Sequence, residues 1–193
     1  MRHTGISSDV MFAHLGRRNV ISMLEGSGIG LLAISIILIF ALRSFKYGAV
    51  SLVANVLPIA VGFGIWGLLV GRIGMGMSVV AGMTLGIVVD YTVHLLSKYR
   101  LAQREQGLST EDAIRYAFST VGVALFVTTV ILTANFGMLS FSDFRLNSDM
   151  GQLTAGIILI ALVVDFFFLP PLLLLLDRKP VASPQAGQSP AQA

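Results

Sequence analysis

Residues 74–97 read GMGMSVVAGMTLGIVVDYTVHLLS, a run of mostly apolar and small side chains whose only acid is Asp90 and whose only histidine is His94. A helix needs about 20 predominantly apolar residues to cross the hydrocarbon core of a bilayer. These 24 residues are enough. An aspartate at the centre of such a helix costs roughly 2.5–3.5 kcal/mol on insertion scales. The stretch therefore predicts a membrane helix that carries an acid for a reason other than stability.

The composition of the whole chain favours a membrane protein over a soluble all-α core. Of the 193 residues, 55% are hydrophobic and 12% are charged, and the mean hydropathy is +0.83. Soluble domains carry about 25% charged residues, so this chain has too few to cover a globular surface. The absence of cysteine excludes disulfides and thiolate chemistry. The net charge of +3 is spread over short connecting segments and forms no basic stripe for nucleic acid.

Five stretches are long and apolar enough to be membrane-spanning helices. Their continuous apolar character favours helices over barrel strands, which alternate and are about half as long. We therefore expect an all-α membrane protein in which residues 26–178 form a five-transmembrane-helix bundle, with spans at about 26–43, 48–71, 74–97, 117–141 and 151–176. Residues 1–25 are expected to be an extracytoplasmic arm, the remnant of a periplasmic domain. Residues 179–193, rich in Pro, Ala, Gln and Ser, are expected to be a disordered cytoplasmic tail.

The positions of lysine and arginine predict the orientation, because cytoplasmic loops carry an excess of them. The loops on the opposite side contain Arg72 and Arg145. The segments after the first, third and fifth spans contain eight basic residues: Arg43, Lys46, Lys98, Arg100, Arg104, Arg115, Arg178 and Lys179. We therefore expect a multi-pass protein of the cytoplasmic (inner) membrane, with its N-terminus outside and its C-terminus in the cytoplasm.

Four residues of the third span, Gly82, Gly86, Asp90 and His94, recur every four positions and share one helix face. Glycines at this spacing let a neighbouring membrane helix approach closely. We therefore expect this face to pack against protein, with Asp90 held away from lipid. Ionisable residues inside spans are functional by default, so we interpret Asp90 as a proton carrier. The alternative is that Asp90 and His94 simply bond each other and stabilise packing, and Tyr91 either donates a hydrogen bond to an acid on another helix or only packs.

Polar side chains in the last two spans are further candidates for a proton path. Thr129 and Thr133 share one face of the fourth span, and Thr128 and Asn135 share another. These groups either line a hydrated path or satisfy carbonyls of their own helix. Asp165 lies near the middle of the fifth span and is a second candidate titrating group. We rank it below the acid of the third span, because no polar residue repeats on its face within two turns.

Local signals predict where helices begin and where they are disturbed. Pro170 and Pro171 remove backbone donors and should kink the last third of the fifth span, and Pro58 should act likewise in the second. Ser109 should cap a helix, with Asp112 three residues later completing a short variant of the capping box.

Several segments resemble a known family of transporters. They are GMTLGIVVDYTVHLLSKYR (82–100), STEDAIRYAFSTVGVALFVTTVILTANFGMLSFSDF (109–144) and LVVDFFFLPPLLLLLD (162–177), preceded by ALRSFKYG (41–48) and ANVLPIAVGFGIWGLL (54–69). Over residues 24–178 the chain is similar to the second membrane half of resistance-nodulation-division (RND) exporters. The nearest resemblance is to the branch of the large mycobacterial membrane proteins and the hopanoid and predicted lipid exporters.

This resemblance implies a twelve-helix pump, driven by inward proton flow, that moves hydrophobic or amphiphilic molecules through large periplasmic domains. It implies that Asp90 and Tyr91 belong to the proton relay. It also implies a first half with a matching acid and tyrosine. We therefore expect this chain to require the N-terminal half of the transporter or a homologous partner chain, besides membrane lipids and its substrate. No cofactor is expected.

Three other functions compete with transport as interpretations of the sequence. An intramembrane aspartyl protease should show Gly-x-Gly-Asp, whereas Val88 and Val89 precede Asp90 here, so we do not expect an enzyme. The histidines, at positions 3, 14 and 94, are far apart and form no His-Glu-x-x-His metal site. A sterol-sensing-like regulatory module and a protein-secretion accessory subunit stay open as alternatives.

Overall fold

Every regular element described in the computed structural model, which covers residues 21–22, 25–37, 39–40, 44–71 and 75–177, is a helix. An apolar helix, Glu25–Ile37, comes first. The elements that follow are α2 (Phe45–Leu69), α3 (Met75–Glu105), α4 (Thr110–Ala117), the π-helix η1 (Phe118–Gly122), α5 (Val123–Leu139), α6 (Arg145–Val163), the π-helix η2 (Val164–Phe168) and α7 (Leu169–Leu176). The predicted all-α class is confirmed over these residues.

Four helical stretches are long and apolar enough to cross a membrane: Phe45–Leu69, Gly76–Glu105, Thr110–Leu139 and Arg145–Leu176. They correspond to the second to fifth predicted spans. The first predicted span, 26–43, is represented by the shorter Glu25–Ile37 helix, and part of it lies outside the described residues. The predicted tail at 179–193 and most of the predicted arm at 1–25 also lie outside them.

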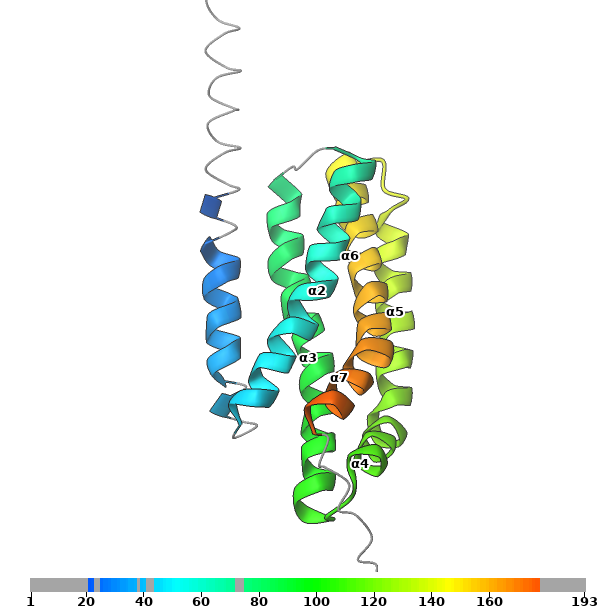
Figure 1. Ribbon diagram of the computed structural model, residues 1–193. Helices are drawn as coiled ribbons and strands as arrows, with labels where there is room; N and C mark the ends of the chain where they lie inside the picture. The colour runs from blue at the N-terminus through cyan, green and yellow to red at the C-terminus, as the bar shows by residue number, and fades with distance from the viewer. Residues whose placement is uncertain (1–20, 23–24, 38, 41–43, 72–74, 178–193) are drawn as a thin grey trace, which may run out of the picture.

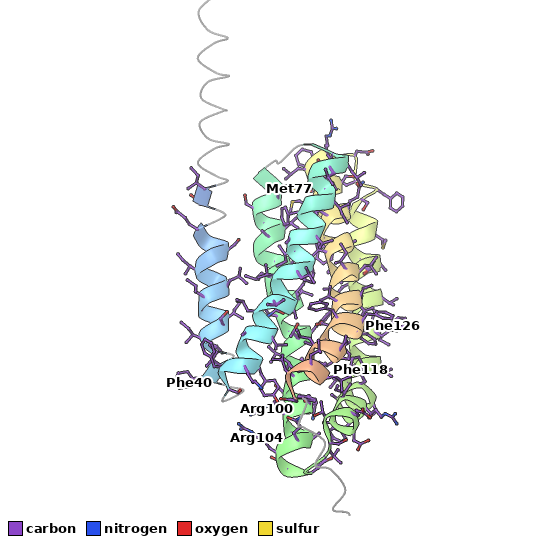
Figure 2. All side chains as sticks on the ribbon, viewed as in Figure 1. Phe40, Met77, Arg100, Arg104, Phe118 and Phe126 are labelled. Carbon is purple, nitrogen blue, oxygen red and sulfur yellow. The ribbon has the colours of Figure 1, made fainter. Side chains whose placement is uncertain are left out.

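The four long stretches form a bundle in which α6 contacts α2, α3 and α5. Figure 1 shows the Glu25–Ile37 helix to one side of this bundle, and α4 below it, leading into α5. Met77 lies at one end of α3, and Arg100 and Arg104 lie at the other (Figure 2). Near the Met77 end, a hydrophobic cluster from three helices fills the interior: Trp66, Met77, Val80, Val88, Leu153, Ile157 and Ala161.

Two glycines allow the close helix contacts of this bundle. A Cβ added at Gly62 of α2 would clash with the side chain of Ile157 of α6. A Cβ added at Gly151 of α6 would lie 2.6 Å from the backbone oxygen of Phe136 and 2.8 Å from Cβ of Leu139, both in α5. A side chain at Gly151 would therefore force α5 and α6 apart.

The last span is disturbed where the prolines predict it. Pro170 and Pro171 occupy the first turn of α7, directly after the π-helix η2. The backbone N–H of Leu169 bonds to the carbonyl of Val164, five residues back, so the helix widens before the prolines. In contrast, α2 continues through Pro58 without an interruption.

The predicted start of the α4 helix is confirmed. The N–H of Asp112 donates to Oγ of Ser109 at 3.2 Å, and the Ser109 hydroxyl donates to Oδ2 of Asp112 at 2.7 Å. These bonds fix the point at which the chain turns back toward the bundle after α3.

Candidate functional site

The helix α3 has two different faces. Its inward face carries buried residues at helical spacing: Val80, Thr84, Val88, Thr92, Leu95, Leu96 and Tyr99. Its outward face carries Gly82, Gly86, Asp90 and His94. Asp90 is the central residue of α3 (Met75–Glu105), with 15 residues of the helix on each side of it. Thr92 lies about 200° around the helix from Asp90, so the two side chains point in nearly opposite directions.

Asp90 and His94 contact each other on the outward face. His94 Nε2 lies 3.3 Å from Asp90 Oδ1, and the two side chains are 59% and 65% exposed, respectively. A Cβ added at Gly82 or Gly86 would meet nothing within 4 Å. The prediction that this face packs against protein is therefore wrong for the described part of this chain. The bundle instead packs against the opposite side of α3, which leaves the acid and both glycines outside.

The buried acid of the bundle is Asp165, which is 2% exposed. It is the second residue of η2, and its Oδ1 accepts a 3.1 Å hydrogen bond from the hydroxyl of Thr92. Its other oxygen, Oδ2, has no hydrogen-bond partner. Among the described residues, the structure thus buries Asp165 and leaves Asp90 exposed, whereas the ranking of the two acids as titrating groups stays a prediction.

Tyr91, which follows Asp90 in the chain, is buried inside the bundle. Its side chain is 2% exposed, and its hydroxyl lies beside the side chain of Thr129 and within electrostatic reach of both Asp90 and Asp165. The Tyr91 and Thr129 hydroxyls interact with each other, and neither forms a hydrogen bond to a third residue. The hydrogen bond from Tyr91 to an acid on another helix therefore stays a prediction, although an acid of η2 is near.

The polar residues of α5 separate into the two faces that their spacing predicts. Thr129 is fully buried, and the hydroxyl of Thr133 is buried without a partner. Thr128 and Asn135 are exposed, on a helix that also exposes Phe126 (Figure 2). The structure thus places the Tyr91 side chain beside Thr129 inside the bundle and leaves Thr128 on the outside.

Sequence reasoning missed Thr92, although it is a polar residue in an apolar span. The signal was its position two residues after Asp90, which places it on the opposite helix face. Without knowing which face points inward, this position had no evident meaning. Of the three histidines, His3 and His14 lie outside the described residues, and the structure groups no three His, Cys, Asp or Glu side chains within its described ranges.

A second polar cluster, also missed, surrounds Asp177 at the end of α7. Its Oδ2 accepts hydrogen bonds from the hydroxyl of Tyr99 at 2.6 Å, from the hydroxyl of Tyr47, and from Nε2 of Gln103 at 3.4 Å. Burial by itself raises the pKa of this carboxyl. The hydrogen bonds, together with the nearby Lys46 ammonium, outweigh that effect and hold the pKa below its ordinary value. The Asp177 cluster therefore fastens the end of the last helix to α2 and α3.

The described helices, with their apolar outer surface, are matched by one family model. The model described as "MMPL family" covers residues 13–191. The chain belongs to the MMPL family. Within this MMPL-family chain, the four long apolar helices are those of a multi-pass membrane protein.

Two curated relatives are similar to this MMPL-family chain. The putative membrane protein MJ1562 of Methanocaldococcus jannaschii is 28% identical over 150 residues, which are 78% of this chain and 38% of that protein. The trehalose monomycolate exporter MmpL3 of Mycobacterium tuberculosis is 30% identical over 101 residues, which are 52% of this chain and 11% of that protein. The matched region of this chain thus spans well under half the length of either relative.

Proposed function

We propose that this chain forms one membrane half of an exporter that is driven by the proton-motive force and moves hydrophobic or amphiphilic, lipid-like molecules. Membership of the MMPL family supports the transporter class. The similarity to MmpL3, an exporter of trehalose monomycolate, supports a lipid-like substrate. The observation that carries the proposal is the contact between Asp90 and His94 at the centre of α3, on the outside of the bundle.

A carboxyl in that position needs a protein partner. Facing acyl chains, it would cost roughly 2.5–3.5 kcal/mol, and contact with His94 offsets only part of that cost. Gly82 and Gly86 lie on the same face with open space above them, so a second helix can come close. An N-terminal half of the transporter, or a homologous partner chain, would cover this face and shield Asp90 from lipid.

The proposed relay takes up and releases a proton at Asp90. His94, which already contacts the carboxyl, holds its orientation. Tyr91, the neighbour of Asp90 in the chain, is buried beside Thr129, and in the proposed relay it would pass the proton inward from Asp90. Thr128 is exposed on α5 and would line the path only where the partner half meets that helix.

The proposed orientation places the Arg100 end of α3 in the cytoplasm. Arg100 and Arg104 lie at that end (Figure 2), as does Lys46, whose Nζ donates to the carbonyl of Leu176 at 3.0 Å. Positive side chains are enriched on the cytoplasmic side of membrane proteins. The protein would then lie in the cytoplasmic membrane with its N-terminus outside.

The test compares Asp90→Asn with Asp90→Glu in cells that carry the complete assembly. The readout is efflux of a lipid-like substrate, measured with and without a proton uncoupler. We expect loss of uncoupler-sensitive efflux in Asp90→Asn, which cannot bind and release a proton, and partial efflux in Asp90→Glu, which can. Equal efflux in the two variants would reject the proton role.

The matched control is Asp143→Asn, which makes the same chemical change at an exposed carboxyl between α5 and α6. We expect wild-type efflux from this variant. Immunoblots of the membrane fraction establish that all three variants are present at wild-type levels, so that a loss of efflux reports on transport and not on abundance.

A further inference from the structure

The hydrogen bond between Thr92 and Asp165 lies in the interior of the bundle. Thr92 is fully buried, and Asp165 is 2% exposed. The Thr92 hydroxyl donates to Oδ1 of Asp165 at 3.1 Å, whereas Oδ2 of the same carboxyl has no hydrogen-bond partner among the described residues. The two oxygens of this carboxyl therefore have different surroundings, and the difference bears on where the group can hold a proton.

Thr92 has two acceptors for its one hydroxyl proton. The carbonyl oxygen of Val88, one turn earlier in α3, lies 3.4 Å away, and Oδ1 of Asp165 lies 3.1 Å away. A threonine inside a helix often bonds to the carbonyl four residues back, as Thr84 does with Val80 at 2.7 Å. Because the bond to Asp165 is the shorter of the two, Thr92 serves the carboxyl more than its own helix.

A neutral carboxyl fits these surroundings better than a carboxylate. An ionised Asp165 would keep a single hydrogen bond, from an uncharged hydroxyl. Burying an unpaired charge is so costly that such a group becomes neutral instead. Hydroxyl donors also approach a carboxylate to about 2.5–2.7 Å, which is shorter than this bond. In the neutral acid, the oxygen that accepts from Thr92 is the carbonyl oxygen, and the proton resides on Oδ2.

Charged side chains on the surrounding helices do not face Asp165 in a way that would favour the carboxylate. Tyr91, the residue before Thr92, has an electrostatic influence on this site and is uncharged near neutral pH. Asp90 and His94 lie on the outward face of α3. The elements η1 and α5 carry no titratable residue. The titratable residues of α2, α6 and the end of α7 lie toward helix ends, and the lysines and arginines of α3 begin six residues past Thr92: Lys46, Tyr47, Arg145, Asp149, Asp177 and Lys98.

We propose that Thr92 is a positioning residue for Asp165, and that Asp165 is an inner proton-binding group of the relay whose proton is carried on Oδ2. The Thr92 hydroxyl keeps Oδ1 as the carbonyl oxygen, so the transferable proton stays on the oxygen that no other group engages. That O–H bond breaks when water entering the bundle takes the proton, and it forms again when a proton returns. The carboxylate left in between keeps the hydrogen bond from Thr92, which is stronger to a charged acceptor. The inference rests on the proposed function in treating the buried acid as part of the relay.

The first experiment records infrared spectra of the full chain in lipid nanodiscs at neutral pH. A protonated carboxyl has a carbonyl-stretch band separate from that of a carboxylate, and a hydrogen bond to its carbonyl oxygen lowers the frequency. We expect a carboxylic-acid band that Asp165→Asn lacks and that the exposed-site control Asp143→Asn retains. An unchanged carboxylic-acid band in Asp165→Asn would overturn the proton-binding site.

Variants of Thr92 test the positioning role. Thr92→Val preserves the shape of the side chain but removes the donor, so the band should move to higher frequency, and Thr92→Ser should restore it. Thr84→Val is the matched control, because Thr84 is also buried on α3 but bonds to its own helix, and it should leave the band in place. An unshifted band in Thr92→Val would overturn the positioning role. If Asp165→Asn does not fold, the shift in Thr92→Val and its reversal in Thr92→Ser decide.

The second experiment measures uncoupler-sensitive efflux in cells that carry the complete assembly. Asp165→Asn should lose it, Thr92→Val should reduce it, and Thr92→Ser should restore it at equal abundance in the membrane. Full efflux from Asp165→Asn would overturn the relay role of this acid.

The outcomes separate this inference from the proposed function. If the carboxylic-acid band and its shift are observed but efflux is the same in Asp90→Asn and Asp90→Glu, the proton site at Asp165 stands and the proton role of Asp90 fails. If the Asp90 variants differ as expected but Asp165→Asn lacks no band, the relay at Asp90 stands and the inner site fails.

Discussion

The hydroxyl of Thr92 donates a 3.1 Å hydrogen bond to Oδ1 of Asp165, joining two positions 73 residues apart in the chain. This bond connects the inward face of α3 to the π-helix η2. Asp90 lies only two residues from Thr92, about 3 Å along the helix axis, but on the outward face. Asp90 and Asp165 therefore lie on opposite sides of α3.

Replacing Thr92 by valine should destabilise the chain by about 1 kcal/mol. The change removes the hydrogen bond to Asp165 but preserves the shape of the side chain, and such bonds in membrane proteins average about 0.6 kcal/mol, up to about 1.7. The measurement is the free energy of unfolding in mixed micelles. Thr84→Val is the control, because Thr84 is also buried on α3 but donates to Val80 of its own helix at 2.7 Å. Equal losses in the two variants would contradict a stabilising role for the link to Asp165.

Gly151→Ala should destabilise the chain by several kcal/mol or prevent it from folding. The new Cβ would lie 2.6 Å from a backbone oxygen of α5, which cannot move without shifting that helix. Overpacking of this kind typically costs 1–3 kcal/mol, or more where backbone must move. Gly156→Ala on the same helix meets nothing within 4 Å and should leave stability unchanged. The folded yield and the free energy of unfolding of the two variants are compared with those of the wild type. A Gly151→Ala protein as stable as the wild type would disprove the close contact.

Gly86→Leu should weaken association with the partner half and leave the fold of this chain intact. Gly86 is exposed, and a Cβ there meets nothing within the chain, so a large side chain can obstruct only a partner. We expect co-purification with the N-terminal half or partner chain to fall at least tenfold. Gly64→Leu is the control, since Gly64 is an exposed α2 glycine with the same open space. Undiminished co-purification of Gly86→Leu would place the partner on another face.

Asp177 should make stability depend on acid pH. Its folded pKa lies below the ordinary value, so it stabilises the fold above the unfolded pKa of about 3.9. That stabilisation is lost as the pH falls through the lower folded pKa. The melting temperature of the wild type should therefore fall more between pH 6 and pH 3 than that of Asp177→Asn, which lacks the titrating group. Asp143→Asn, as control, should follow the wild type, and parallel curves for wild type and Asp177→Asn would exclude this contribution.

Most of the helix positions could be predicted from the sequence. Four spans follow from runs of about 20 apolar residues, because a polar backbone crosses hydrocarbon only in helices or closed barrels, and barrel strands alternate and are about half as long. The start of α4 at Ser109 and the disturbance before Pro170 follow from local hydrogen bonding, which depends on neighbouring residues alone. The third span ends later than its apolar run, because the polar residues up to Glu105 continue the same helix.

The candidate site was predicted only in part. Four candidates could be identified because each is a polar residue within an apolar stretch of sequence: Asp90, Tyr91, Thr129 and Asp165. Their neighbours did not follow, because Tyr91 lies beside Thr129, and Thr92 bonds to Asp165, only once the helices have packed. The Asp177 cluster could not be predicted for the same reason. Its hydrogen-bond donors come from positions 47, 99 and 103, which are far from Asp177 in the sequence.

The sequence by itself determined that the chain crosses a membrane as helices and that Asp90 and Thr92 lie on opposite faces of one of them. Only the tertiary structure decided that Thr92 points inward and Asp90 outward. The physical reason is that lipid and protein interior are both apolar, so the hydrophobic pattern that orients a helix in a soluble protein does not distinguish the two sides here. Packing of α2 and α6 against α3 makes that choice.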